Sequence, residues 1–292
     1  MKWRQVLRGA LIFLPAASAL CDEAKWRAVA EALGKTGTET PDGVYRVGLP
    51  RTDLKIVVDG VEVKPALALG SWLAFRLQEE RGTVMGDLVL TADEVNPVLR
   101  KLVQAGIEAT ALHNHLLRAS PETFYMHIHG TGEPVKLAAA LHEALALSHT
   151  PLVAVSAAPA PLGLDTALID RLLGAAGKAT GGVYQLSFKR AGAIREARMD
   201  VPGSMGTAEA INFQSTGAGQ VAIAGDFVLT ADEVTPVVNA LTRHGIEVTA
   251  LHNHMLREEP RLFFLHFWAT GDVERLASGL RAALDRIELA KE

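Results

Sequence analysis

The chain has 292 residues, of which 49% are hydrophobic and 21% are charged. This is the composition of a globular protein, and the length suffices for two domains of roughly 130 residues each. The formal net charge is −4 and the pI is near 6.2. Lys and Arg are scattered and form no basic block, so the sequence predicts a protein that does not bind nucleic acid.

The N-terminal segment has the pattern of a secretory signal peptide. Lys2 and Arg4 precede an uncharged stretch at 9–20, which is too short to span a bilayer comfortably. Ala17 and Ala19 supply the small residues that cleavage requires. We therefore expect a signal peptide over 1–19 and an exported mature chain, located in the periplasm or outside the cell.

The single cysteine, Cys21, follows this segment. A lipoprotein signal would place the cysteine directly after a small residue, whereas Leu20 precedes it here. Two alternatives stay open: Cys21 is a free thiol near the mature N-terminus, or it carries a lipid anchor that is the chain's one attachment to a membrane. In either case one cysteine forms no disulfide within the chain, so stability must come from packing.

The sequence contains an internal duplication. Residues 86–145 align without a gap with residues 225–284, at an offset of 139, and 33 of the 60 aligned positions are identical. Upstream the resemblance is weaker but persists, as in DGVYRVGLPR and GGVYQLSFKR. We predict repeat 1 over 22–155 and repeat 2 over 160–292, joined by a linker rich in Ala, Pro and Gly.

In chain order, each repeat begins with a helix, predicted over 24–33 and 165–176, and continues with strands of alternating polar and apolar residues. A helix follows that ends at Gly106 or Gly245, and an amphipathic helix closes the unit. The remaining strands, first and second copy, are predicted at 84–90 and 223–229, at 107–115 and 246–254, and at 123–130 and 262–269.

The T-x-x-E sequence that begins at Thr91, with its copy at Thr230, has the form of a capping box that starts a helix. Pro97 leaves a later start open, with Asn96 as the cap, and repeat 2 offers the same choice. The order of elements predicts an α+β fold of two tandem homologous domains. Each is an antiparallel sheet with helices on one face, ferredoxin-like or related, in which the two histidine-bearing strands form a hairpin.

Histidines recur at equivalent positions in the T-A-L-H-N-H segment and in the next strand. Alternation along a strand places the two histidines of H-x-H on one face, together with Ile107, Ala109 and Ala111. Side chains opposite each other in a hairpin lie about 5 Å apart, so a histidine on the neighbouring strand can join them at one ion. Zinc is the metal that such a set suits best. The candidate ligands are His113, His115, His127 and His129 in repeat 1 and His252, His254 and His266 in repeat 2.

Two other interpretations of the histidines stay open. They can be neutral core residues that fix the hairpin, because the strand around them is apolar and a buried charge is costly. They can also bind a small ligand without a metal. The copies differ in that Trp268 replaces His129, and the sequence does not indicate which copy carries the site.

Other polar residues supply candidates for catalysis. Glu258, which has no counterpart in repeat 1, is a candidate base. Arg118 and Arg257 are candidates for binding an anionic substrate, with pairing to an acid as the alternative. Asp87 and Asp226 are expected to have a role in a turn.

At these residues the chain resembles a known family. The segments GDLVLTADEVNPVL, GIEATALHNHLL and GIEVTALHNHML are similar to those of the LppY/LpqO family of exported bacterial proteins. The resemblance covers nearly the whole mature chain. It implies export and duplication, and it assigns no reaction and no role to any residue.

The sequence therefore predicts an exported, metal-dependent hydrolase that uses clustered histidines, with a small molecule or a metal ion as its partner. The alternatives are an envelope protein that binds a metal or small ligand without turnover, and a purely structural protein with core histidines. The oligomeric state is not predicted.

Overall fold

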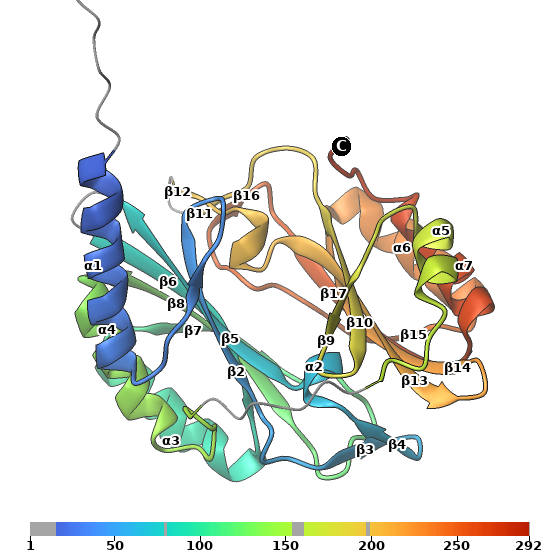
Figure 1. Ribbon diagram of the computed structural model, residues 1–292, viewed down its shortest axis with the longest axis horizontal. Coiled ribbons are helices and arrows are strands. Elements are labelled where there is room, and N and C mark those ends of the chain that lie inside the picture. The colour runs from blue at the N-terminus through green and yellow to red at the C-terminus, as the bar shows by residue number, and fades with distance from the viewer. Residues whose placement is uncertain (1–15, 79–80, 154–160, 197–198, 292) are drawn as a thin grey trace, which may run out of the picture.

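A computed structural model describes residues 16–78, 81–153, 161–196 and 199–291. Two large sheets face each other across the middle of the molecule, the longer helices cover their outer faces, and the short helix α2 (Pro65–Ala68) lies between the sheets (Figure 1). Each sheet with its helices belongs to one repeat. The prediction of two tandem α+β domains, each an antiparallel sheet with helices on one face, is confirmed.

Repeat 1 forms a sheet of six strands in the order β1-β2-β5-β6-β8-β7, and the short strands β3 and β4 form a separate hairpin. Its elements are α1 (Ala16–Leu33), β1 (Thr38–Glu39), β2 (Val44–Pro50), β3 (Ile56–Val58), β4 (Val61–Val63), α2 (Pro65–Ala68), β5 (Gly70–Gln78), β6 (Arg81–Leu90), α3 (Ala92–Gln104), β7 (Glu108–His113), β8 (Phe124–Gly132) and α4 (Pro134–Leu145).

Repeat 2 forms a sheet in the order β15-β17-β14-β13-β10-β9, and β11, β12 and β16 form a small third sheet. Its elements are α5 (Thr166–Leu173), β9 (Lys178–Thr180), β10 (Val183–Lys189), β11 (Arg195–Glu196), β12 (Met199–Asp200), the 3₁₀ helix η1 (Gly203–Met205), β13 (Ala208–Gly217), β14 (Gln220–Leu229), α6 (Ala231–Arg243), β15 (Glu247–His252), β16 (Glu258–Glu259), β17 (Phe263–Asp272) and α7 (Val273–Leu284).

The centre of each repeat is a split β-α-β unit, the element that ferredoxin-like domains share. Strands β6 and β7 run parallel on either side of β8, to which both pair antiparallel, and α3 connects them. Helix α3 begins at the predicted capping box, in which Thr91 and Glu94 satisfy each other's backbone N–H groups. Pro97 therefore lies inside the helix, and Gly106 follows its end with a positive φ of 76°.

Apolar side chains fill three layers. On the outer side of each sheet, α1, α3 and α4 or α5, α6 and α7 bury their apolar faces against the strands. Between the sheets, side chains of both repeats pack together, for example Leu116 and Tyr125 with Trp268, and Met85 with Phe264. The two sheets therefore share one buried seam, and the side chains that face it belong to both repeats.

A buried ion pair ties each capping box to the sheet. Arg51, at the end of β2, is 0% exposed and donates to Glu94 at 2.7 Å and to the Val89 carbonyl at 2.6 Å. Arg190 and Glu233 repeat the arrangement in repeat 2. Glu94 thus caps α3 and, together with Asp53 at 2.8 Å, neutralises the buried guanidinium of Arg51.

The N-terminal predictions fall mostly outside the described residues. Helix α1 begins at Ala16, earlier than the predicted range of 24–33, and its backbone includes Cys21. None of the helices in the described part of the chain has the length and apolar character needed to cross a bilayer.

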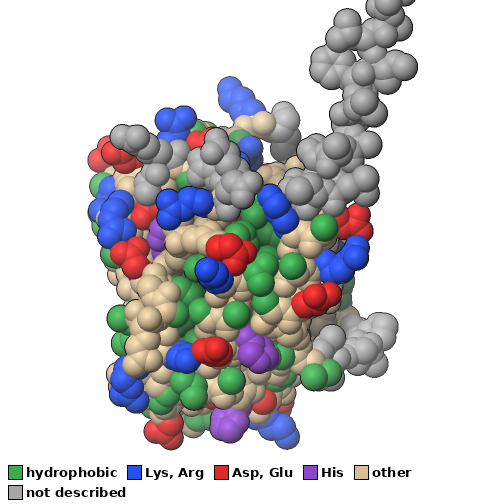
Figure 2. Space-filling model, turned by 90° about the vertical axis from the view of Figure 1, so that its left-hand side faces the viewer, with side chains coloured by type: hydrophobic (Ala, Val, Ile, Leu, Met, Phe, Trp, Pro, Cys, Tyr) green, Lys and Arg blue, Asp and Glu red, His purple; other side chains and the backbone are tan. Residues whose placement is uncertain are grey.

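The outward face of repeat 1 carries Lys and Arg side chains intermingled with Asp and Glu (Figure 2).

We expect Arg51→Met to lower the unfolding free energy by about 3 kcal/mol, because it leaves a buried carboxylate without its partner. For domains of this size that corresponds to a Tm lower by about 6–12 °C in a thermal melt. The control Arg195→Met removes the pair of Arg195 with Asp200, whose side chains are 62% and 61% exposed. It should change the Tm by no more than about 2–4 °C. Equal effects of the two variants would contradict this role of the buried pair.

Candidate metal centre

A β-bulge aims the histidines of repeat 1 at the seam between the sheets. The pairing of β7 with β8 shifts between Ala109 and Ala111, so Ala109 faces the helix-side core with Ile128, whereas Ala111 lies opposite His127. The prediction that Ile107 and Ala109 share a face with the histidines is therefore wrong, because the extra residue of the bulge reverses the alternation. His113 lies at the end of β7, directly opposite Tyr125.

Repeat 2 has the same bulge, between Val248 and Ala250, and brings its histidines to the same seam. The two sets stack on each other across it. The rings of His113 and His252, which are equivalent in the two repeats, have centroids 3.5 Å apart. The cross pairs are His115 with His266 at 3.5 Å and His127 with His254 at 3.6 Å. The six histidines thus form one cluster with approximate twofold symmetry, rather than two separate sites.

Each imidazole of the cluster has a buried Nε2 atom with no hydrogen-bond partner among the described residues. On the other side of the ring, Nδ1 lies against a backbone carbonyl in three of them. The distances are 3.4 Å from His113 to the Asn114 oxygen, 3.1 Å from His252 to the Asn253 oxygen and 3.2 Å from His266 to the Gly225 oxygen. A carbonyl only accepts, so Nδ1 carries the proton and Nε2 presents a lone pair. Histidine ligands of metals are held in this way.

Imidazole nitrogens of the cluster lie in two groups. One imidazole nitrogen from each of His113, His115, His127 and His252 lies within 4.8 Å of the others, and the same holds for His252, His254 and His266. A single water molecule donates two hydrogen bonds, so it does not satisfy all of three or four acceptors that lie this close together. A metal cation does, and imidazole is a ligand of zinc, copper, iron and nickel.

Two aspartates complete the cluster, and the sequence prediction of a turn role for them is wrong. Asp87 lies on β6 directly opposite His127, and Asp226 lies on β14 directly opposite His266. Oδ2 of Asp87 is 3.9 Å from Nε2 of His115, and the two oxygens of Asp226 are each 3.9 Å from Nε2 of His254 or His266. The one feature of the sequence that could have pointed to these aspartates is the Gly-Asp dipeptide that both repeats retain.

Burial shifts the pKa of every member of the cluster toward its neutral form. Desolvation lowers the pKa of His113 to about 4 and that of His252 to about 3. It raises the pKa of Asp87 and of Asp226 well above the usual value. Without a cation the site is thus a set of neutral imidazoles beside carboxyl groups that resist ionisation. A divalent ion beside the aspartates would lower their pKa and favour the ionised carboxylates.

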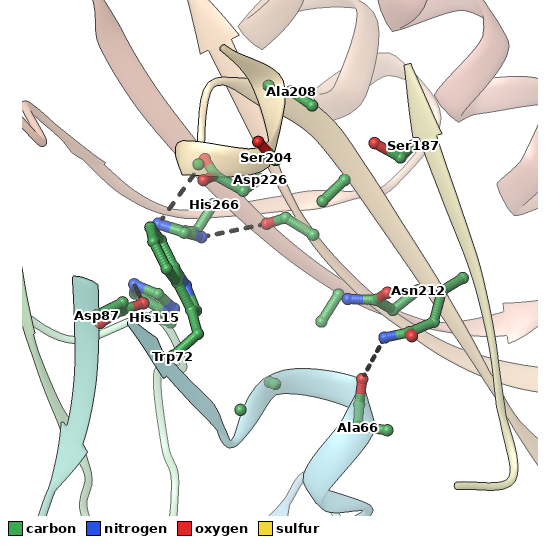
Figure 3. A pocket seen from close by; sticks show the side chains of 18 of the residues that line it. Ala66, Trp72, Asp87, His115, Ser187, Ser204, Ala208, Asn212, Asp226 and His266 are labelled. Carbon is green, nitrogen blue, oxygen red and sulfur yellow. Dashed lines mark hydrogen bonds and ion pairs between the residues drawn. The ribbon is translucent and has the colours of Figure 1, made fainter. Parts of the chain in front are cut away.

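One side of the cluster opens into a cavity of about 650 Å³ between the sheets. Figure 3 shows Asp87 and His115 on one wall and Asp226 and His266 on the other, with Trp72 between them. His254 also lines the cavity, whereas His113 and His252 do not. A small molecule in the cavity would meet three of the six imidazoles and both carboxyl groups. The volume is within the usual range for small-molecule sites.

The structure places two of the sequence candidates outside these groups. His129 lies 3.3 Å from Glu108 and belongs to neither group of nitrogens. Glu258 accepts from Arg261 at 3.1 Å and from the Leu262 N–H at 3.1 Å, and it does not line the cavity. Asp87 and Asp226 are the carboxyl groups that lie beside the histidines, and Glu258 stabilises the turn before β17.

Arg118 and Arg257 are occupied by ion pairs between the repeats. Arg118 donates to Glu247 at 2.6 Å and Arg257 donates to Glu108 at 2.9 Å, and the two pairs are equivalent by the repeat offset. Arg118 also pairs with Asp59 at 2.9 Å. The alternative that these arginines pair with acids is therefore the one that the structure shows, and each of the two equivalent pairs joins one repeat to the other.

The metal-free protein should lose stability as the pH falls from 6.5 to about 4. The pKa of His113 is lowered in the folded state, so the unfolded chain binds more protons in this window and acid favours unfolding. The variant His113→Gln lacks this group, and its Tm should fall less over the same pH range. The exposed His149 provides the control His149→Gln, which should behave as the wild type. If the Tm of all three chelator-treated proteins depended on pH in the same way, the lowered pKa of His113 would be refuted.

Comparison with solved structures gives two distant matches. A trimeric bacterial microcompartment shell protein, PduB, has 11% sequence identity and a TM-score of 0.21, with 87% of this chain and 96% of that chain covered. EtuB from Clostridium kluyveri has 10% identity and a TM-score of 0.22, with 86% and 89% covered. Both scores are too low to bear on function.

Comparison with curated proteins gives no significant match. A family model described as "Domain of Unknown Function (DUF1259)" matches residues 27–147 and again residues 167–286. The two matched segments lie one in each repeat and together cover most of the chain. The chain therefore belongs to the family described as Domain of Unknown Function (DUF1259), in which it carries the domain twice.

Proposed function

We propose that this protein is a metal-dependent hydrolase of the cell envelope whose centre is shared by the two repeats. The observation that carries the proposal is that six buried Nε2 atoms have no partner among the described residues, in a cluster whose imidazole nitrogens lie in two close groups. The histidines come from both repeats and meet at the seam, where a cavity reaches them. Export follows from the signal-like N-terminus, and attachment through Cys21 remains the alternative to a soluble form.

The donor set suits zinc or a similar first-row ion. Each repeat supplies three imidazoles and one carboxyl group, and hard oxygen-only ions such as calcium prefer other ligands. Since Nδ1 of His252 is held by the Asn253 carbonyl, its ring offers one nitrogen and does not bridge two ions. Two ions would therefore divide the six imidazoles three and three, whereas a single ion would take four from the larger group.

A bound ion would supply Lewis acidity and lower the pKa of a bound water. The residues of the chain would do the rest. Asp226 lies between His254 and His266 on the cavity wall. Its carboxylate is placed to take a proton from a water molecule while the oxygen of that water attacks the substrate. The same carboxyl group then returns the proton to the leaving group, so that water is added across the cleaved bond. The apolar side chains of the seam exclude other water.

The second candidate is capture of a metal without turnover. It is favoured by the group of His113, His115, His127 and His252, because four imidazoles fill the tetrahedral positions of zinc and leave none for substrate. Only His115 of this group lines the cavity. The group of His252, His254 and His266 suits turnover better, because His254 and His266 line the cavity together with Asp226.

Metal analysis of the purified chain tests the centre itself. We expect about one to two equivalents of zinc or another first-row ion per chain. His252→Ala should lower the content, because it removes a ligand from whichever group holds His252. His266→Ala should retain the ion held by the four-imidazole group, and the exposed His149→Ala should behave as the wild type. A wild-type chain that neither contains nor takes up metal would exclude both functions.

Hydrolysis of a panel of chromogenic esters, amides and phosphoesters separates the two candidates. Metal-loaded wild-type protein should turn over at least one class. Asp226→Asn should keep its metal but lose about 10²–10⁴-fold in rate, since it no longer accepts a proton. Glu258→Gln, a carboxyl variant outside the cavity, should leave the rate unchanged. Full metal content with no turnover in any class would favour capture.

A further inference from the structure

The wall of the cavity that repeat 1 supplies carries a half-buried arginine. Arg46 lies on β2 and lines the cavity together with Trp72, and its guanidinium is 4.2 Å from the centre of the Trp72 ring. One of its nitrogens donates to the Ser204 carbonyl. No ion pair joins Arg46 to a carboxylate of the described residues within 4.0 Å. The group therefore offers unpaired N–H donors toward the cavity.

Burial makes this cation costly. Desolvation lowers the pKa of Arg46 to about 10, so the side chain remains charged at neutral pH while it lacks the solvation of an exposed arginine. Asp87 of the centre and Asp42 are the acidic groups that act on it, but burial keeps Asp87 toward its neutral form, and Asp42 accepts from Ser204 and Thr40. An anion in the cavity would supply the missing partner.

The two repeats differ in the residues that line the cavity around Arg46, whereas the histidines and aspartates of the centre are the same in both. The repeat offset of 139 pairs Arg46 with Gln185, and both residues line the cavity. In the same register of the sheets, Trp72 lies opposite Asp87 and Ala210 lies opposite Asp226. The histidines and aspartates are thus the same in both repeats, whereas the side chains around the cavity are not. Residues that bind the substrate rather than the metal are expected to show this pattern.

Apart from Asp226 of the centre and the exposed Lys189, the opposite wall is polar but uncharged. Gln185 donates to the Ala66 carbonyl at 2.9 Å and Asn212 donates to the Leu67 carbonyl at 3.0 Å, so helix α2 fixes both amides (Figure 3). Ser187 lies beside them on β10. These groups hydrogen-bond neutral polar atoms. Among the described residues of the repeat 1 wall, Arg46 is the one cation and Asp42 lies nearby, so this wall fits a monoanion better than a doubly charged phosphate.

We infer that the cavity binds a small carboxylate-bearing molecule, with its carboxylate on Arg46 and its uncharged polar part toward Gln185 and Asn212. This inference rests on the proposed function, because it names the substrate class of the same centre. A planar guanidinium binds a planar carboxylate through two parallel hydrogen bonds. The bond to be hydrolysed then lies toward His254, His266 and Asp226, on the other side of Trp72.

Calorimetric titration of the metal-loaded full chain tests the inference with matched pairs of ligands. The probes are acetate with acetamide, N-acetylglycine with N-acetylglycinamide, and benzoate with benzamide, together with inorganic phosphate. We expect at least one carboxylate to bind about tenfold or more tightly than its amide, as one charge-assisted interaction gives. Arg46→Gln should remove this preference, and Arg46→Lys should retain part of it. Arg76→Gln, which removes the same charge from β5 outside the cavity, should retain all of it.

The outcomes separate the two proposals because metal content is measured on the same samples. A metal-loaded chain that shows no preference for any carboxylate, or that prefers phosphate, overturns this inference alone. A preference that survives in Arg46→Gln overturns the role of Arg46. A chain without metal that still selects carboxylates through Arg46 would support the anion site and overturn the metal centre. Circular dichroism of each variant shows whether a loss of binding reflects loss of the fold.

Discussion

Six imidazole nitrogens are buried in the seam between the two sheets without a partner among the described residues, and the arrangement of the molecule follows from this constraint. Leaving one such atom unsatisfied costs about 1–3 kcal/mol. His115, His254 and His266 line the cavity, whereas His113, His127 and His252 do not, and leaving the latter three unsatisfied costs about 3–9 kcal/mol. That is a large part of the stability of an ordinary domain. We propose that a cation offsets this cost and that the cluster is a ligand set for a metal.

The duplication supplies what one repeat lacks. The closest ring contacts of the cluster join one repeat to the other, as in His113 with His252. The reciprocal pairs of Arg118 with Glu247 and Arg257 with Glu108 also join the two repeats. Arg46 on one wall and Gln185 on the other make a symmetric histidine cluster face an asymmetric cavity.

Much of the fold was predictable because it depends on local pattern. The capping box at Thr91 and the glycine at Gly106 mark the ends of α3, and alternation places His127 on the seam side of β8. The shared centre was not predictable, because periodicity does not tell which faces of two sheets pack together. Asp87 was assigned to a turn for the same reason: its role depends on the strand opposite. The bulge at Ala109–Ala111 has no signal in the hydrophobic pattern, and Arg46 joins the site only through tertiary packing.

The most direct test is a crystal structure of the zinc-loaded chain with anomalous data at the zinc edge. The account predicts a peak in the seam, about 2.0–2.1 Å from Nε2 atoms that include histidines of both repeats. It also predicts that Asp87 or Asp226 lies close enough to bind the ion or a water on it. Density at the histidines of one repeat only, or zinc bound elsewhere while the six rings remain stacked on each other, would contradict the claim that the two repeats build one centre.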